Sequence, residues 1–390
     1  MAHKNGGKNG KALIVIAAGG TGGHMFPAQA LTRLLVERGW RVALFTDKRG
    51  KDFGPDLAEV QTHRLAAAAV LGTGLWRKAL AGLQILRGTW QAKHLLRKLG
   101  AKAVVGFGGY ASVPTVWAAG KLGLKVVIHE QNAVIGRANR LLAPKAGAIA
   151  TSFASVRGLP ETLKERIHLT GNPVRAAIAE VGRRPYAVPG PRDRLTLLVT
   201  GGSQGARVFN ELVPAAVCRL PDAIKTRLKV VQQVRGSDLQ EVAATYKACG
   251  VEAELKPFFD DMPQRLAQAT LLLCRSGAST VAEIAAAGRP ALLVPYPFAA
   301  DDHQRANAEA LCAAGGGWVM HQSELDVARL SAELERLFSQ PALLVRAAGA
   351  ARAFAVDDAA RRLADLVEGR LKTDGRSPNG RQGGAGERAA

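Results

Sequence analysis

A glycine-rich loop that ends in a histidine, Gly19-Gly20-Thr21-Gly22-Gly23-His24, is the first segment whose residue types suit chemistry. Glycines let backbone N–H groups approach an anion, and a helix that starts after the loop adds partial positive charge. We expect that helix to begin near Pro27, because proline is favoured at a first helical position. The loop matches neither the dinucleotide-binding nor the P-loop pattern, and a plain tight turn is the alternative. An imidazole at the mouth of an anion loop can serve as a general base or contact a phosphate.

Two further glycine loops follow apolar runs in the same way. They are Gly106-Phe107-Gly108-Gly109-Tyr110 and Gly201-Gly202-Ser203-Gln204-Gly205-Ala206-Arg207. Open parallel sheets bind ligands at the carboxyl ends of their strands, and the Ser203 hydroxyl can donate to a phosphate. Three glycine loops that face one cleft suit two phosphate-bearing ligands, one for each domain.

Polar side chains close two other predicted strands. His129-Glu130-Gln131-Asn132 places four hydrogen-bonding residues in a row at a strand end, which favours ligand recognition over a structural role. Arg275–Glu283 runs into a helix that we expect to end at Ala287, before a glycine and a proline. The N-terminus of this helix would face a diphosphate while Glu283 binds a ribose. The alternative is that Thr280 and Glu283 simply form a capping box.

Metal and disulfide chemistry are not indicated. The loop Asp301-Asp302-His303-Gln304 pairs two acids with a histidine, but no further ligand lies at a suitable spacing, so we expect no metal site. The cysteines form no C-x-x-C pair, so we expect reduced, mostly buried thiols and no disulfide framework or zinc site. They are Cys218, Cys249, Cys274 and Cys312.

The elements that must position these loops alternate short apolar runs with longer helical stretches. Continuous Val, Ile, Leu and Ala runs indicate strands covered on both faces, and helices between them indicate parallel sheets. The strands expected in the first half are Ala12–Ala18, Arg41–Phe45, Ala103–Gly106, Val126–His129 and Ala148–Ala150. Those of the second half are Leu195–Thr200, Lys229–Gln233, Glu252–Pro257, Leu271–Cys274 and Ala291–Val294.

A proline-rich stretch from Gly171 to Pro191 separates the two arrays, as a linker would. Residues 13–23 and 195–205 also resemble each other, each a strand that runs into Gly-Gly-[Ser/Thr]-x-Gly. We therefore expect an α/β fold with two Rossmann-like domains whose parallel sheets face one another across a cleft. The ranges expected are 1–182 for the first domain, 183–345 for the second, 346–371 for a helix that returns to the first, and 372–390 for a disordered tail. The last helices are expected at about Asp326–Phe338 and Leu343–Leu371.

The net charge of +21 is divided unevenly. Residues 1–182 carry 26 Lys and Arg against 9 Asp and Glu, whereas residues 183–390 carry 27 against 23. This asymmetry points to an anionic partner for the first half, which is nucleic acid, an anionic membrane or a phosphorylated substrate. The stretch from Leu75 through Trp90 to Lys98, which includes Arg77, Lys78 and Arg87, interleaves aromatic, aliphatic and cationic residues with no acid. That pattern is typical of an interfacial helix, although a core helix with a basic outer face would share it.

Several motifs, in order over about residues 12–310, make the chain resemble the MurG family, the bacterial peptidoglycan N-acetylglucosaminyltransferases that convert lipid I to lipid II. They are Gly-Gly-Thr-Gly-Gly-His (19–24), Gly-Gly-Tyr (108–110), His-Glu-Gln-Asn (129–132), Gly-Asn-Pro-Val-Arg (171–175), Gly-Gly-Ser-Gln-Gly-Ala-Arg (201–207), Arg-Ser-Gly-Ala-x-Thr-Val-x-Glu (275–283) and Asp-His-Gln (302–304).

The resemblance implies a GT-B fold and an inverting, metal-independent transfer of N-acetylglucosamine from UDP to the C4 hydroxyl of N-acetylmuramic acid in lipid I, with no cofactor. The partners that it implies are UDP-N-acetylglucosamine, lipid I, the anionic surface of the inner membrane and a cell-wall synthesis complex, but no nucleic acid. It places the protein peripherally on the cytoplasmic face of that membrane.

Site residues follow from the same resemblance, position by position. In this family the uracil pairs with the backbone near Phe259, Glu283 binds the ribose, and Gln304 and Asn132 read the sugar hydroxyls. Position 259 is aromatic where an aliphatic residue is common, and residues 279 and 282 also vary, which affects only side-chain detail. The donor contacts carried over are Thr21, Gly22, Gly23, Asn132, Arg175, Ser203, Phe259, Ala278, Ser279, Thr280, Val281, Ala282, Glu283 and Gln304.

For a displacement at the sugar C1 we expect His24 to be the base, with Glu130 as the second candidate. The leaving UDP would be stabilised electrostatically by the helix N-terminus at Ala278–Thr280, by Ser203 and by Arg175. Two other hypotheses stay open. One is a UDP-N-acetylglucosamine 2-epimerase of the same fold, and the other is a nucleic-acid-binding protein, prompted by the pI of 10.4 but without a recognised motif.

Overall fold

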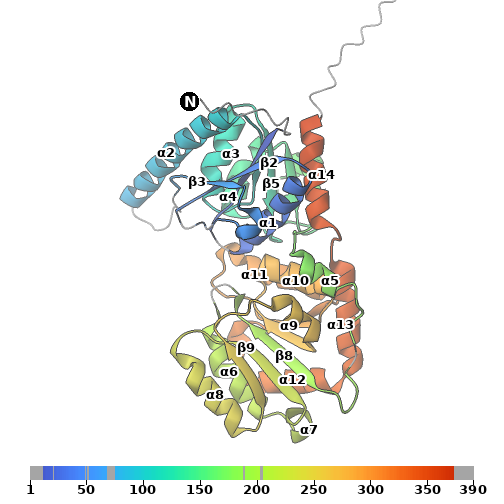
Figure 1. Ribbon diagram of the computed structural model, residues 1–390. Coiled ribbons are helices and arrows are strands. Elements are labelled where there is room, and N and C mark those ends of the chain that lie inside the picture. Colours follow the sequence, from blue (N-terminus) through green and yellow to red (C-terminus); the bar gives the residue numbers. More distant parts are fainter. Residues whose placement is uncertain are drawn as a thin grey trace, which may run out of the picture.

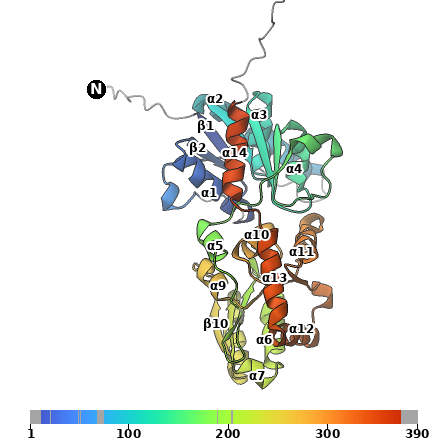
Figure 2. The same cartoon turned by 90° about the vertical axis from the view of Figure 1, so that its right-hand side faces the viewer.

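The computed structural model describes residues 12–20, 22–48, 50, 52–67, 75–187, 189–202 and 205–372, without the side chains at 75, 77–79 and 237. Two α/β domains lie one above the other, and each is built on a parallel sheet with helices on both faces (Figures 1 and 2). The expected pair of Rossmann-like domains is therefore confirmed. The tail expected at 372–390 lies outside the described residues, apart from Lys372 at the end of the last helix.

The first domain holds a seven-stranded sheet in the order β3-β2-β1-β4-β5-β6-β7. Apolar clusters cover both of its faces, which is why its central strands are continuous apolar runs. The sequence did not predict β3 or β7, since strands at the edges of the sheet carry polar and exposed residues. The strands are β1 (Leu13–Ala17), β2 (Arg41–Thr46), β3 (Gln61–Arg64), β4 (Ala101–Gly106), β5 (Lys125–Glu130), β6 (Ala148–Thr151) and β7 (Ile167–Leu169).

The second domain holds a six-stranded sheet in the order β10-β9-β8-β11-β12-β13. Here too the sequence missed an edge strand, β13, which is three residues long and only partly buried. The strands are β8 (Leu195–Thr200), β9 (Leu228–Gln233), β10 (Glu252–Lys256), β11 (Leu271–Cys274), β12 (Ala291–Leu293) and β13 (Gly317–Val319).

The α-helices fill the connections between strands and form the C-terminal end of the described chain. Those of the first half are α1 (Gly22–Glu37), α2 (Leu75–Leu99), α3 (Ser112–Lys121), α4 (Arg137–Leu142) and α5 (Ala176–Val181). Those of the second half are α6 (Arg207–Cys218), α7 (Asp222–Lys225), α8 (Leu239–Ala248), α9 (Met262–Gln268), α10 (Ala278–Ala287), α11 (His303–Ala313), α12 (Val327–Ser339), α13 (Pro341–Phe354) and α14 (Ala359–Lys372).

The single helix expected at Leu343–Leu371 is wrong, because the structure has two helices there, α13 and α14. The chain breaks after Phe354 and turns through Asp358, whose φ of 54° is left-handed. This break lets α14 leave the second domain and pack on α1 of the first (Figure 2). Leu363 and Val367 of α14 are buried in an apolar cluster of the first domain.

Helix α1 begins at Gly22, inside the glycine loop, and the start expected near Pro27 is wrong. Pro27 is a buried residue within the helix. Because proline has no N–H, it cannot bond the carbonyl of Gly23, four residues earlier. That carbonyl instead accepts a hydrogen bond of 3.3 Å from the Ser279 hydroxyl of the second domain. The proline therefore leaves an acceptor available at the domain interface.

The expectation of reduced thiols is wrong for two of the four cysteines. Cys218 and Cys249 form a disulfide, with their Cα atoms 5.4 Å apart. The pair was hidden in the sequence because 31 residues separate the two positions, and only the packing of α6 against α8 brings them together. Cys274 and Cys312 are free thiols, and burial raises the pKa of each, to about 12 and about 11.

Candidate active site

A cavity of about 880 Å³ lies between the two domains. Its walls are the segments that follow β1, β4 and β5 in the first domain and β8 to β12 in the second. Both sheets thus present the carboxyl ends of their strands to one space, which is where open parallel sheets bind ligands.

Most of the residues singled out from the sequence line this cavity. Thr21 and Ser203 lie outside the described residues. Val281 is buried in the core of the second domain, and Ala282 beside it is not part of the cavity wall. The residues that line it are Gly22, Gly23, His24, Glu130, Asn132, Arg175, Phe259, Ala278, Ser279, Thr280, Glu283 and Gln304.

His24 sits in the first turn of α1, against the second glycine loop. Gly108 and Gly109 have left-handed φ angles of 78° and 70°, and a Cβ on either would lie 3.5–3.6 Å from ring atoms of His24. The loop therefore needs glycine for its backbone conformation and lies beside the imidazole. Burial, with a smaller contribution from His303, lowers the pKa of His24 to about 4, so the ring is neutral and able to accept a proton at neutral pH.

Glu130 organises the segment that follows β5. One carboxylate oxygen accepts hydrogen bonds from the backbone and side-chain amides of Asn132, at 3.0 and 3.3 Å. The other accepts from the Gly136 N–H at 2.9 Å and from the Asn139 amide at 2.8 Å. Burial raises the pKa of Glu130, and these donors oppose that shift. The side chain thus holds Asn132 in place.

His129 is fully buried next to this segment. Its Nδ1 accepts from the Gln131 amide at 3.1 Å, so its Nε2 carries the proton and donates to the Gly171 carbonyl at 2.9 Å. Burial lowers the pKa of His129 to about 4, which agrees with this neutral form. His129 therefore connects β5 to the start of the linker, and Gln131 fixes the orientation of its ring.

The N-terminus of α10 faces the cavity. Gly277 is the N-cap residue and makes no side-chain capping bond, so the first N–H groups of the helix remain available to an anion. The capping box considered for Thr280 and Glu283 is not formed. Glu283 instead accepts a hydrogen bond of 3.0 Å from Arg175 of the first half. Burial raises the pKa of Glu283, and Arg175 opposes that shift.

Gln304 lies in the first turn of α11. Its side-chain oxygen accepts from the Tyr296 N–H at 3.0 Å, and its backbone carbonyl accepts from the Ser276 hydroxyl at 2.7 Å. These contacts fix the side-chain oxygen on the protein, so the amide nitrogen is the group that can face a ligand.

Asn307, one turn further along α11, is a residue that sequence reasoning missed. Its side chain is fully buried between the domains. Its oxygen accepts from the Ala133 N–H at 2.8 Å, and its nitrogen donates to the Asn132 side chain and to the Ser276 carbonyl, both at 3.1 Å. The only signal in the sequence was its position three residues after Gln304, on the same helix face.

An ion pair also crosses the mouth of the cleft. Two nitrogens of the Arg137 guanidinium on α4 donate hydrogen bonds of 3.1 Å to Asp301, one to each carboxylate oxygen. Sequence reasoning considered Asp301 only as a possible metal ligand in a polar loop and did not predict this ion pair. Among the described residues, no three His, Cys, Asp or Glu side chains cluster as metal ligands would.

Comparisons with known proteins agree with this geometry. Residues 14–151 match the glycosyltransferase family 28 N-terminal domain and residues 196–363 match its C-terminal domain. The fold is also that of the crystal structure of Acinetobacter baumannii MurG, with a TM-score of 0.73 and 30% identity over 92% of this chain and all of that one. The fold and the site therefore define a glycosyltransferase of the GT-B class.

A Rhodospirillum centenum protein is 55% identical over 92% of this chain and 94% of its own length. It is a UDP-N-acetylglucosamine–N-acetylmuramyl-(pentapeptide) pyrophosphoryl-undecaprenol N-acetylglucosamine transferase. The chain belongs to this family of transferases, and the resemblance seen in the sequence is confirmed. A Listeria monocytogenes protein assigned as a UDP-N-acetylglucosamine 2-epimerase is 13% identical with a TM-score of 0.64, a likeness that shows the fold alone.

Proposed function

We propose that the protein transfers N-acetylglucosamine from UDP-N-acetylglucosamine to the C4 hydroxyl of N-acetylmuramic acid in lipid I, with inversion and without a metal, to form lipid II. The observation that carries this proposal is the placement of anion-binding groups and a neutral imidazole around one cavity, on elements of different domains.

The donor side of the cavity is formed mainly by the second domain, with Arg175 and Asn132 contributed by the first half of the chain. The uncapped N-terminus of α10 offers N–H groups and partial positive charge to the diphosphate. Arg175 adds a cation, and its buried Nε has no hydrogen-bond partner among the described residues. Glu283 suits a ribose hydroxyl, while Gln304 and Asn132 suit the sugar. Stabilisation of the leaving UDP is then electrostatic.

The acceptor side is formed by the first domain, with His24 as the base. The neutral ring takes the proton from the C4 hydroxyl as that oxygen attacks C1 and the bond from C1 to the UDP oxygen breaks. Gly22 and Gly23 precede His24 at the N-terminus of α1, where the acceptor's own diphosphate can approach backbone N–H groups. Glu130 is the second candidate for the base, but its four donors favour a role in positioning Asn132.

We expect the purified protein to transfer labelled N-acetylglucosamine to a lipid I analogue at an undiminished rate in EDTA, because the diphosphate is neutralised by protein groups. Product should depend on the acceptor. Release of UDP with 2-epimerised sugar in the absence of acceptor would instead favour the epimerase, and no transfer would contradict the proposal. Filter binding to DNA at physiological salt tests the nucleic-acid hypothesis.

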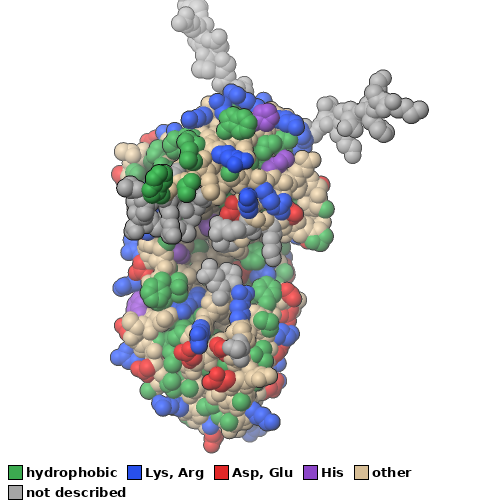
Figure 3. Space-filling model, turned by 90° about the vertical axis from the view of Figure 1, so that its left-hand side faces the viewer, with side chains coloured by type: hydrophobic (Ala, Val, Ile, Leu, Met, Phe, Trp, Pro, Cys, Tyr) green, Lys and Arg blue, Asp and Glu red, His purple; other side chains and the backbone are tan. Residues whose placement is uncertain are grey.

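A stripe of exposed apolar side chains on α2 supports contact with a membrane. Trp76 and Trp90 are 85% and 71% exposed, and Leu80, Leu83 and Leu86 between them are also exposed. Their spacing places them on one face of the helix. Figure 3 shows hydrophobic side chains beside Lys and Arg on this side of the first domain. Within the described part of the chain, the helices are too short or too polar to span a bilayer.

We infer that α2 lies in the interface of an anionic leaflet, at the cytoplasmic face of the inner membrane where lipid I would be presented. Its exposed apolar face suits the headgroup boundary, and the cations around it suit anionic lipids. A cell-wall synthesis complex on the same membrane is a further partner that this position would allow.

Changing Trp76, Leu83 and Trp90 to Ser should weaken binding to vesicles of anionic phospholipid by at least about tenfold, since three apolar side chains no longer enter the interface. Reversal of Arg77, Lys78 and Arg87 to Glu should weaken it as well, most strongly at low salt. Vesicle pelleting measures both. Leu169→Ser, an exposed leucine of β7, serves as the control, and unchanged pelleting of the α2 variants would exclude this surface.

A further inference from the structure

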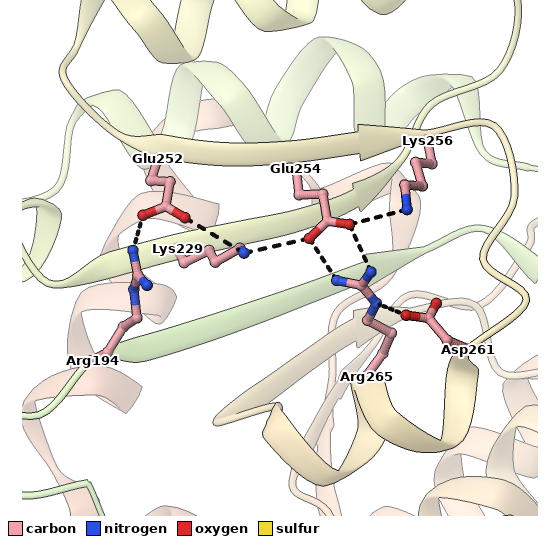
Figure 4. Close-up of polar contacts among 7 residues, drawn as sticks. All are labelled: Arg194, Lys229, Glu252, Glu254, Lys256, Asp261 and Arg265. Atoms are coloured by element: carbon pink, nitrogen blue, oxygen red, sulfur yellow. Dashed lines mark hydrogen bonds and ion pairs between the residues drawn. The ribbon is translucent and has the colours of Figure 1, made fainter.

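A network of ion pairs surrounds the start of the loop between β10 and α9, on the donor side of the cavity. Figure 4 shows two glutamates of β10 alternating with cations: Glu252 pairs with Arg194 and Lys229, and Glu254 pairs with Lys229, Lys256 and Arg265. The Arg265 end of this network is the less exposed one, since its side chain is 12% exposed against 60% for Arg194.

Arg265 uses its whole guanidinium fork. Two of its nitrogens donate to the two oxygens of Glu254, both at 2.6 Å, and its Nε donates to Asp261 at 2.8 Å. Its central carbon also lies 5.1 Å from the centre of the Phe259 ring. Bidentate pairing and stacking of this kind require a planar guanidinium, and lysine cannot reproduce them.

These contacts close the loop from both ends. Glu254 lies on β10 before the loop, Asp261 is the N-cap residue of α9 after it, and Phe259 lies between them. Phe259 and the neighbouring Phe258 line the cavity. The aromatic ring at 259, where an aliphatic residue is common in the family, is what gives Arg265 a surface to stack on. Arg265 holds the pKa of Glu254 down to about 2, so the pair stays ionised at working pH.

The geometry points to Arg265 as a positioning residue that preorganises the loop which reads the nucleobase of the donor. This inference rests on the proposed function and on the family resemblance, which implies that the backbone near Phe259 pairs with the uracil of UDP. Contacts at both ends of the loop and at the Phe259 ring hold its backbone donors and acceptors in one arrangement. Such preorganisation strengthens binding of the nucleotide and discrimination between bases.

Arg265→Lys should weaken UDP binding by about tenfold, because the fork and the ring contact are lost while the charge is kept. The preference for UDP over CDP should shrink by a similar factor, since the two differ only at the base edge. KM for UDP-N-acetylglucosamine should rise, and kcat at saturating donor should stay within about twofold. Calorimetry with UDP and CDP measures the affinities without any acceptor.

Arg194→Lys is the matched control, because it changes the same residue type in the same network without touching the loop. Glu254→Gln weakens the same ion pair from the carboxylate side, and it should lower UDP affinity and base preference as Arg265→Lys does. It provides the test if Arg265→Lys folds poorly. The double variant Arg265→Lys/Phe259→Ile should bind UDP no more weakly than whichever single variant binds it less tightly. Both substitutions remove the same contact, between the guanidinium and the ring. UDP affinity and base preference that stay at wild-type values in Arg265→Lys and Glu254→Gln would overturn the inference. A wild-type protein that does not bind UDP would contradict the proposed function instead.

Discussion

Replacing His24 with alanine is expected to lower kcat by about a hundredfold to ten-thousandfold, the range over which a general base contributes. The ring is held by α1 and the Gly108–Gly109 loop, so the variant loses a proton acceptor while the donor wall stays intact. The affinity for UDP should therefore change little. Steady-state transfer to a lipid I analogue and calorimetry with UDP measure the two effects separately.

The pH profile provides an independent check on His24. Burial lowers its pKa to about 4, so the neutral, proton-accepting form persists as pH falls and is lost only near that value. The kcat/KM of the wild type should hold down to about pH 5 and then decline, whereas an ordinary histidine would titrate near 6.5. A midpoint near 6.5, or a His24→Ala variant within a few-fold of wild type, would move the base elsewhere. His168→Ala, an exposed histidine on β7, is the matched control.

Glu130→Gln separates the two candidates for the base. Gln keeps one acceptor but presents an amide NH₂ to N–H donors, so the Asn132 segment should shift. If Glu130 positions Asn132, this variant should raise KM for the donor as well as lower kcat. A loss confined to kcat, with the acid limb of the pH profile abolished, would identify Glu130 as the base.

Asn307→Ala is expected to reduce kcat/KM by about a hundredfold, because it leaves buried groups of both domains without partners, at a cost of about 1–3 kcal/mol each. Those groups are the Ala133 N–H, the Ser276 carbonyl and the Asn132 side-chain oxygen. The bonds to Ala133 and Asn132 join the second domain to the first, and the bond to Asn132 also sets the orientation of a residue proposed to read the sugar. Thermal unfolding should also shift to a lower temperature.

Two variants sharpen the Asn307 experiment. Asn307→Asp keeps the acceptor for Ala133 but loses both donated hydrogen bonds, so it should also lose activity. Asn210→Ala removes an asparagine on α6 that pairs with Asp238 and does not line the cavity, and it should retain wild-type kinetics. Activity within about threefold of wild type in Asn307→Ala would show that the buried bridge does not position the site.

The sequence identified the central strands and the loops that follow them, because both depend on local patterns. A strand buried on two faces must be a continuous apolar run, and an anion loop at its end must be rich in glycine. That was enough to predict two parallel-sheet domains and to bring His24, Asn132 and Glu283 to one cleft, whereas Gln304 was added by the family resemblance. The edge strands β3, β7 and β13 were not predicted, because a half-exposed edge strand is not a continuous apolar run.

Which residues far apart in the sequence contact each other was decided only by the tertiary structure. Asn307 bridges to Asn132 over 175 positions, Arg137 to Asp301 over 164 and Arg175 to Glu283 over 108. Cys218 and Cys249 are joined for the same reason, through the packing of two helices. Residue types and short-range spacing reveal which side chains can do chemistry, because backbone conformation is a local property. Which of them meet depends on how helices and sheets that are distant in the sequence pack against each other, and that is determined by contacts with no local signature.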